Sequence, residues 1–198
     1  MTKFKNKYRI ESARLKNWDY AESAAYFVTI CTANRTPFFG MVQNNALINS
    51  EIGKIVASEW VKSPEIRPDM NLELGEFVVM PDHFHGIIFI GGMDAMNRVH
   101  TMHDRDAMHR VSTMHDGDAT HRVSTMHRVS TGDIYKNEFG PQSKNLSSII
   151  RGFKSGVTVQ ARKINPEFGW QARFHDHIIR NSKSYDVISQ YIIDNPKK

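Results

Sequence analysis

The chain has 198 residues, with 26 Lys and Arg, 21 Asp and Glu, ten His and one Cys. That length suits one ordinary domain, and the lone Cys31 excludes a disulfide framework and a cysteine-based zinc site. The longest apolar runs are far too short to cross a bilayer, and the basic stretch 1–20 lacks the apolar segment of a secretory signal. We therefore expect a soluble, cytoplasmic protein that makes no membrane contact.

The charge is unevenly distributed along the chain. The formal net charge is +5, but from Pro141 onward ten Lys and Arg stand against only four Asp and Glu. A basic C-terminal third favours a polyanionic partner, although an excess of charge can also serve solubility alone.

Hydrophobic periodicity predicts four strands and three helices. The strands are expected at 26–32, 72–80, 84–90 and 170–179, and the helices at 51–61, at 146–164 and from just after Ser182 to near Pro196. Ser50 is a suitable N-cap for the first helix, and a tight turn at Pro81 and Asp82 would pair the second and third strands as a hairpin. This order predicts an α+β fold in which helices pack against an antiparallel sheet.

A repeat of period twelve occupies residues 94–133. Its copies are nearly identical and offer little apolar area, so we expect a weakly ordered insertion at about 91–133 that interrupts a single domain spanning 1–198. The alternative is a metal-binding histidine tract, because six of the ten histidines recur there. They are His100, His103, His109, His115, His121 and His127.

The sharpest local motif is MPDHFHG. On a strand, His83 and His85 face the same way and can converge on one divalent ion, while Phe84 points to the opposite face. An isolated H-x-H pair is weak evidence for a metal site, since it also occurs by chance. A metal would need a third ligand from elsewhere in the chain.

The last predicted helix supplies a candidate ligand. Tyr191 and Asn195 are four residues apart and therefore lie on one helical face. Asn195 could offer a carbonyl oxygen to a hard cation, with Tyr191 one turn away. Alternatively, Tyr191 is a core aromatic residue and Asn195 caps the helix before Pro196. Tyr185 is a competing tyrosine on the same helix.

Basic residues mark a candidate surface for phosphate. Arg151, Lys154 and Arg162 form a stripe on the helix at 146–164, and Arg173 and Arg180 flank the strand that follows it. Each could equally be a solvated surface charge. His175 and His177 also share a face of that strand, and we interpret them as structural.

Taken together, the segments MPDHFHGIIFI, LSSIIRGFKSGVT and WQARFHDHIIRNSKSYDVISQYIIDNP resemble the HUH single-tyrosine transposases, and in particular the REP-associated tyrosine transposases. The resemblance implies a ferredoxin-like antiparallel sheet with packed helices. It also implies that His83 and His85 are the motif histidines, that Tyr191 is the nucleophile and that Asn195 completes the metal site.

The same resemblance implies an activity and its partners. The chain would be a metal-dependent single-stranded DNA endonuclease and strand transferase that uses Mg²⁺ or Mn²⁺ and forms a 5′-phosphotyrosine intermediate. Its partner would be single-stranded or hairpin DNA, and the protein would act as a monomer or a homodimer. Two alternatives remain open, which are a catalytically inactive protein that binds DNA hairpins and a metal buffer that uses the repeats.

Overall fold

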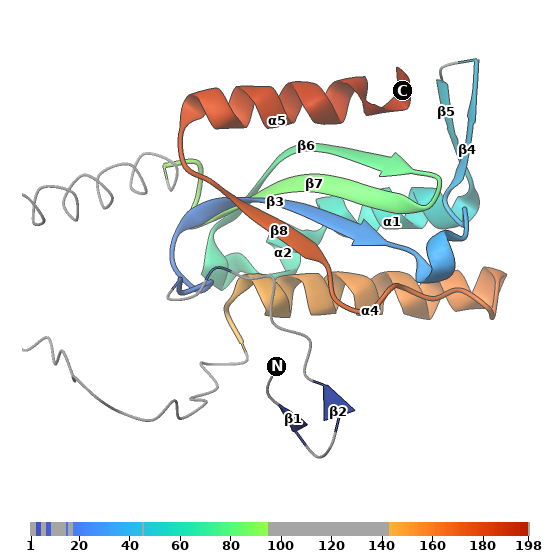
Figure 1. Ribbon diagram of the computed structural model, residues 1–198, viewed down its shortest axis with the longest axis horizontal. Coiled ribbons are helices and arrows are strands. Elements are labelled where there is room, and N and C mark those ends of the chain that lie inside the picture. The colour runs from blue at the N-terminus through green and yellow to red at the C-terminus, as the bar shows by residue number, and fades with distance from the viewer. Residues whose placement is uncertain are drawn as a thin grey trace, which may run out of the picture.

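The computed structural model in Figure 1 describes residues 3–4, 7–8, 15, 18–44, 46–94 and 143–197. The predicted repeat insertion therefore lies outside the described residues from position 95 onward. The strands are β1 (Lys3–Phe4), β2 (Lys7–Tyr8), β3 (Ala24–Cys31), β4 (Gly40–Gln43), β5 (Ala46–Asn49), β6 (Leu72–Met80), β7 (His83–Ile90) and β8 (His175–Ile179). The helices are α1 (Glu51–Val61), α2 (Ser63–Ile66), α4 (Leu146–Ile164) and α5 (Ser182–Asp194), with short 3₁₀ turns η1 (Ala33–Arg35), η2 (Pro68–Met70) and η3 (Asn195–Lys197).

Four strands form the central antiparallel sheet in the order β6-β7-β3-β8. Helix α1 connects β3 to β6, and α4 precedes β8, so the chain order is β-α-β-β-α-β. This order, with the two connecting helices on one face, is the ferredoxin-like arrangement. The predicted fold class is confirmed, as are the hairpin of β6 and β7 and the bounds of α1 and α4.

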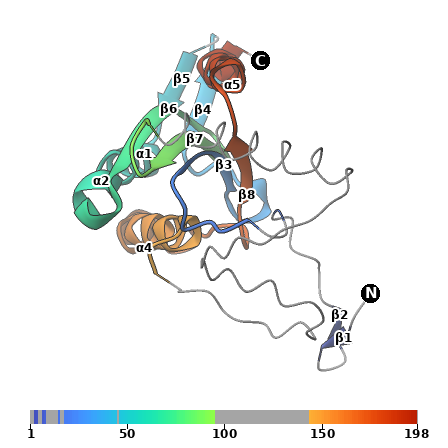
Figure 2. The same ribbon diagram turned by 90° about the vertical axis from the view of Figure 1, so that its left-hand side faces the viewer.

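The helices divide between the two faces of the sheet. Helices α1 and α4 cover one face, and α5 alone lies against the other, as Figures 1 and 2 show from two directions. Ser50 caps α1 as predicted, because its hydroxyl accepts a hydrogen bond from the Gly53 amide at 3.1 Å. Among the helices that the structure describes, none has the length and apolarity needed to cross a bilayer.

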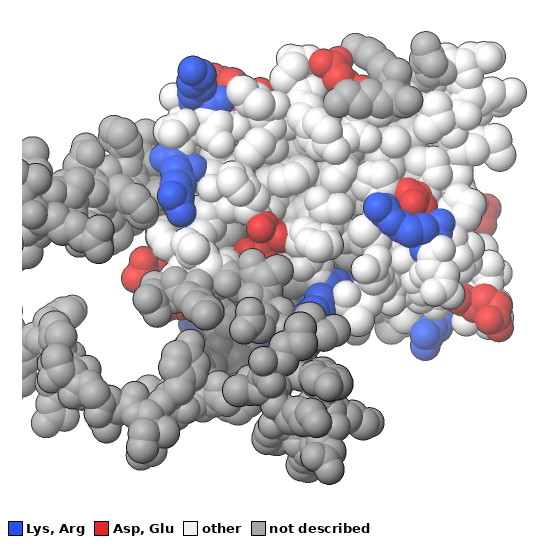
Figure 3. All heavy atoms as spheres, in the orientation of Figure 1, with Lys and Arg blue, Asp and Glu red and all other residues white. Residues whose placement is uncertain are grey.

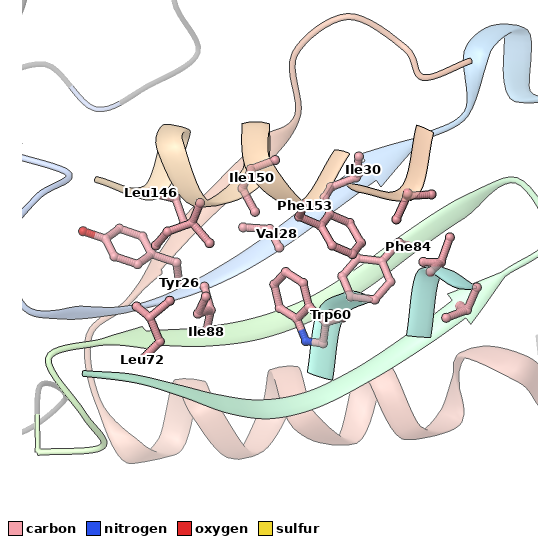
Figure 4. Close-up of a cluster of buried hydrophobic side chains, with 14 of the residues drawn as sticks. Tyr26, Val28, Ile30, Trp60, Leu72, Phe84, Ile88, Leu146, Ile150 and Phe153 are labelled. Atoms are coloured by element: carbon pink, nitrogen blue, oxygen red, sulfur yellow. The ribbon is translucent and has the colours of Figure 1, made fainter. Parts of the chain in front are cut away.

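The larger core lies between the sheet and the pair α1 and α4. Trp60 of α1, Phe84 of β7 and Phe153 of α4 meet there, with ring centroids 4.8 to 5.5 Å apart. Figure 4 shows these rings among the aliphatic side chains of β3 and α4. A smaller apolar cluster joins α5 to the other face and comprises Ala25, Val78, Ile87, Phe89, Ile179 and Ile192. Alternating strand residues thus supply one core on each face.

Two local features differ from the sequence prediction. The strand expected at 170–179 is wrong in its first half, because Arg173 adopts a φ of +69° that interrupts the extended backbone. Trp170 keeps only an isolated bridge to Thr32. The hairpin of β4 and β5 was not predicted, since its apolar residues Met41 and Ile48 are exposed and show no burial pattern.

Candidate active site

The histidine pair lies at the start of β7, directly after the turn at Pro81 and Asp82. Phe84 packs into the larger core, so the pleat of the strand turns His83 and His85 toward the α5 face. Their ring centroids are 4.6 Å apart. His85 is only 5% exposed, whereas His83 is partly open to solvent. The two imidazoles therefore converge as the motif predicts.

Each imidazole has a hydrogen-bond partner at Nδ1. The Nδ1 of His83 lies 2.6 Å from Oδ1 of Asp82, and the Nδ1 of His85 lies 2.8 Å from Oγ1 of Thr29. Arg35 in turn donates to the other carboxylate oxygen of Asp82 at 3.3 Å. When Nδ1–H donates to such a partner, the lone pair on Nε2 is presented to a metal. Contacts of this kind orient the imidazoles of a histidine metal site.

The protonation state of His85 also suits a ligand. Burial is the main cause that lowers the pKa of His85 to about 4, and the neighbouring His83 and Arg35 act in the same direction. The imidazole is therefore neutral at pH 7. A neutral imidazole is the form that binds a divalent metal ion.

Helix α5 brings Tyr191 to this pair. The helix begins at Ser182, where the side chain of Asn181 accepts a hydrogen bond from the Ser184 amide at 2.8 Å. The ring of Tyr191 lies 5.5 Å from the ring of His85, centroid to centroid. Tyr191 is 40% exposed, so its side chain is accessible from solvent.

Phe27 on β3 links the tyrosine and the histidine. Its ring is stacked on His85 with centroids 5.3 Å apart and meets Tyr191 edge-on at 6.2 Å. Both arrangements are favourable for aromatic pairs. The three rings form a compact group, and sequence analysis did not find Phe27 because only the register of β3 against β7 places it there.

Asn195 lies at the same end of α5. It is 7% exposed and begins η3, one helical turn after Tyr191. Its backbone N–H donates to the carbonyl of Ile192, so the residue ends the helix as well. An amide oxygen is a suitable donor for a hard cation. Its role as a metal ligand stays a prediction.

The donor set fits a divalent ion only if a residue other than His, Cys, Asp or Glu completes it. Within residues 18–94 and 143–196, position 45 excepted, no group of three or more His, Cys, Asp and Glu side chains could hold a metal. His83 and His85 supply two imidazole nitrogens, and Asn195 is the polar side chain predicted from the sequence for the third place. Two imidazoles and an amide oxygen admit Mg²⁺, Mn²⁺ and Zn²⁺.

Three other candidates lie on this face. Tyr185 is half-buried and packs its ring 5.8 Å from Phe89, within the apolar cluster. His175 and His177 pair with Thr29 and Phe27 across β3 and β8, so they share the α5 face. Both are exposed, and the structural role expected for them stays a prediction.

Three of the five predicted phosphate contacts lie on one side of the sheet. Arg151, Lys154 and Arg162 belong to α4, on the side opposite α5 (Figure 2). Arg173 precedes β8 and Arg180 follows it, and both are exposed. Figure 3 views the molecule with α5 above α4, and the visible Lys and Arg side chains there are scattered rather than gathered into one patch.

Two of the α4 residues make contacts within the protein. The ammonium of Lys154 donates to the carbonyls of Gln171 at 2.8 Å and Arg173 at 3.1 Å, and it lies 5.6 Å from the centroid of the Trp170 ring. Arg162 donates from Nε to the carbonyl of Phe168 at 3.1 Å. These hydrogen bonds hold the segment 168–173, which precedes β8, against α4. Contact of the five basic residues with DNA stays a prediction.

The fold is shared with a transposase of known structure. A solved structure of a REP-associated tyrosine transposase bound to a REP hairpin matches with a TM-score of 0.52, over 96% of this chain and 73% of that chain, at 18% sequence identity. At that identity the match shows a shared fold.

The chain belongs to the same family as an uncharacterized protein of Haemophilus influenzae, to which it is 32% identical over 186 residues. The alignment covers 93% of this chain and 87% of the relative. No protein-family model matches the chain.

Proposed function

We propose that this protein is a metal-dependent enzyme that nicks and rejoins single-stranded DNA, with Tyr191 as its nucleophile. The observation that carries the proposal is the approach of the Tyr191 ring to within 5.5 Å of His85, whose own ring lies 4.6 Å from His83. A nucleophile beside two imidazoles is an arrangement that suits metal-assisted phosphoryl transfer.

His83, His85 and Asn195 would hold the divalent ion. When bound, the ion supplies electrostatic stabilisation of the negative charge that develops on the phosphate oxygens. Asp82 and Thr29 orient the two imidazoles through their Nδ1 atoms, so the protein fixes both rings before any ion arrives.

Tyr191 carries out the covalent step. Its phenol oxygen forms a bond to phosphorus while the bond from phosphorus to the 3′ oxygen breaks, and the phenol proton is lost as the 3′ oxygen gains one. The products are a 5′-phosphotyrosine linkage and a free 3′-hydroxyl. The reverse reaction, with a 3′-hydroxyl on another strand as the attacking group, rejoins DNA without an external energy source.

The phenol needs assistance because a tyrosine hydroxyl ordinarily has a pKa near 10 and is a poor nucleophile at neutral pH. Tyr191 is positioned by α5 rather than by a loop. Ile192 beside it is fully buried in the apolar cluster, which fixes the rotation of the helix about its axis. The ring therefore stands at the histidine pair in one defined orientation.

DNA hairpins are the proposed partner. The solved transposase that shares this fold is bound to a REP hairpin, and the C-terminal third of the present chain is basic. Arg151, Arg162, Arg173 and Arg180 are the proposed phosphate contacts, and Lys154 would add its charge from its place beneath the segment 171–173. Binding should therefore weaken steeply with salt.

The test is formation of a covalent protein–DNA adduct. The full chain is incubated with hairpin DNA carrying single-stranded tails, with Mn²⁺ or with a chelator, and the products are separated under denaturing conditions. We expect an adduct that needs the metal and disappears in Tyr191→Phe. Tyr185→Phe, on the same helix, is the matched control and should retain it.

Two outcomes would contradict the proposal. An adduct that survives Tyr191→Phe would place the nucleophile elsewhere. Hairpin binding with no adduct in any divalent cation would identify a non-catalytic hairpin-binding protein instead.

A further inference from the structure

A groove of about 550 Å³ lies between α5 and the strands beside it. Phe27 and His177 line it from the sheet, and Lys183, Ser184, Val187 and Ile188 line it from α5. Pockets of this size commonly hold a small organic ligand or one building block of a polymer.

The groove is continuous with the candidate active site. Phe27 lines the groove and also contacts both Tyr191 and His85. Val187 lies one helical turn before Tyr191, a rise of about 6 Å along the helix. A ligand in the groove would therefore lie directly beside a group that reacts with Tyr191.

The lining has the chemistry of a nucleotide site. Phe27 and His177 contribute aromatic rings to the lining, and Val187 and Ile188 contribute apolar surface, so a base of any identity can pack there. Lys183 provides a positive charge for a phosphate, and Ser184 provides a hydroxyl. Among the described residues that line the groove, none is acidic.

One lining residue has a close counterpart on the other side of the protein. Val187 on α5 is 63% exposed, and Val159 on α4 is 62% exposed. An apolar side chain that is this exposed buries little surface on folding. Both residues can therefore be substituted with small effects on the free energy of unfolding. Val159 is therefore a matched control for Val187.

We infer that the groove binds the base of one unpaired nucleotide next to the phosphate that Tyr191 attacks. The inference rests on the proposed function for the identity of the ligand, but binding in the groove does not require the covalent step. Base binding in the groove would thereby set which nucleotide of the single strand lies at Tyr191. A preference of the groove for particular bases would then influence which phosphate is cut.

The experiment measures binding without cleavage. Full-length Tyr191→Phe protein is titrated into a fluorescein-labelled DNA hairpin with oligothymidylate tails, and an abasic site replaces each tail nucleotide in turn. Stacking of one base on an aromatic platform predicts a loss of roughly tenfold in affinity at one tail position. Other tail positions should change affinity much less.

Substitutions then assign that position to the groove. Val187→Asn in the same background should weaken binding of the intact probe roughly tenfold, whereas the equally uncharged Val159→Asn should leave it unchanged. With Val187→Asn, the sensitive abasic probe should bind no worse than the intact one. Thermal unfolding of both variants checks that the fold is retained.

The inference is overturned if the abasic scan is flat, or if Val187→Asn weakens every probe by the same factor. Its failure is distinguishable from failure of the proposed function. If one tail position is sensitive but the unsubstituted protein forms no adduct, base binding in the groove is supported and the proposed nicking activity is contradicted. If an adduct depends on Tyr191 but the abasic scan is flat, the nicking activity is supported and base binding in the groove is contradicted.

Discussion

The two faces of the central sheet use the same strands for different purposes. On the α1 and α4 side, Trp60, Phe84 and Phe153 form a closed aromatic core. On the α5 side, the apolar cluster gives way to His83, His85 and the exposed Tyr191. Because strand residues alternate, β7 contributes Phe84 to one face and both histidines to the other. One face carries the larger core. The other face combines the smaller apolar cluster with polar groups at fixed spacing.

Loss of a histidine should have the largest effect on the α5 face. We expect His85→Ala to lower the rate of adduct formation by at least about a hundredfold, because the metal site loses a ligand. His175→Ala changes an exposed histidine on the same face and should leave the rate within about twofold. Adduct formation in time courses with Mn²⁺ measures both. Equal losses in the two variants would mean that the α5 face acts without a defined histidine pair.

The matching experiment on the other face concerns stability. Phe153→Ala should lower the free energy of unfolding by about 3 to 5 kcal/mol, because it leaves a cavity beside Trp60 and Phe84. Val159→Ala on the same helix should change it by less than about 0.5 kcal/mol. Urea denaturation followed by tryptophan fluorescence gives both values. A small effect of Phe153→Ala would remove the contrast between the faces.

The sequence predicted the parts of this contrast that are local. The helical periodicity of 51–61 and 146–164 has a single apolar face, and α1 and α4 occupy those residues. The alternation of residues around Phe84 is enough by itself to assign the two histidines to one face of the strand. The order of elements then limited the fold to an antiparallel sheet with packed helices, which the structure confirms.

Features that depend on pairing between distant segments were not predicted. Thr29 reaches His85 only because β3 lies beside β7 in one register, although the two residues are 56 positions apart in sequence. The groove depends on the position of α5 against β3 and β8. The topology likewise places the basic residues of α4 on the side of the sheet opposite Tyr191. Hydrophobic periodicity describes the environment of a residue and does not identify its partner.

Removal of the Thr29 hydroxyl tests a contact of this kind. Thr29→Val keeps the shape of the side chain but removes the partner of His85 Nδ1, and we expect metal affinity to fall about 10-fold to 100-fold. Thr158→Val on α4 removes a hydroxyl that donates to the carbonyl of Lys154 at 2.6 Å, and it should not change metal affinity. Isothermal titration with Mn²⁺ is the measurement. Unchanged affinity in Thr29→Val would show that the hydroxyl does not position the ring.

Alkaline pH should lower the free energy of unfolding through Tyr26, which lies in the core on the α4 side. Burial raises the pKa of Tyr26 to about 12, and its oxygen accepts a hydrogen bond from Trp18 at 3.0 Å. An unfolded tyrosine ionises near pH 10 while the folded one keeps its proton, so this residue should reduce stability by about 1.4 kcal/mol per pH unit between pH 10 and 12. Tyr26→Phe should flatten that dependence in urea titrations. An unchanged slope would contradict a buried neutral phenol.

Single arginines should have the smallest effects. Arg180→Ala and Arg151→Ala should each lower the slope of log affinity against log salt by about 0.9 or less, the value for one lost phosphate contact. Fluorescence anisotropy with hairpin DNA at several salt concentrations measures the slopes. A change in Arg180→Ala alone would contradict the predicted contact at Arg151.

The most direct test of the central claim locates the covalent bond. The adduct formed with Mn²⁺ is digested with nuclease and trypsin, and the peptide that spans residues 184–197 is fragmented by mass spectrometry. This peptide contains both Tyr185 and Tyr191. The account predicts a nucleotide phosphate on Tyr191 and an unmodified Tyr185. A phosphate on Tyr185, or on any residue outside this peptide, would contradict it.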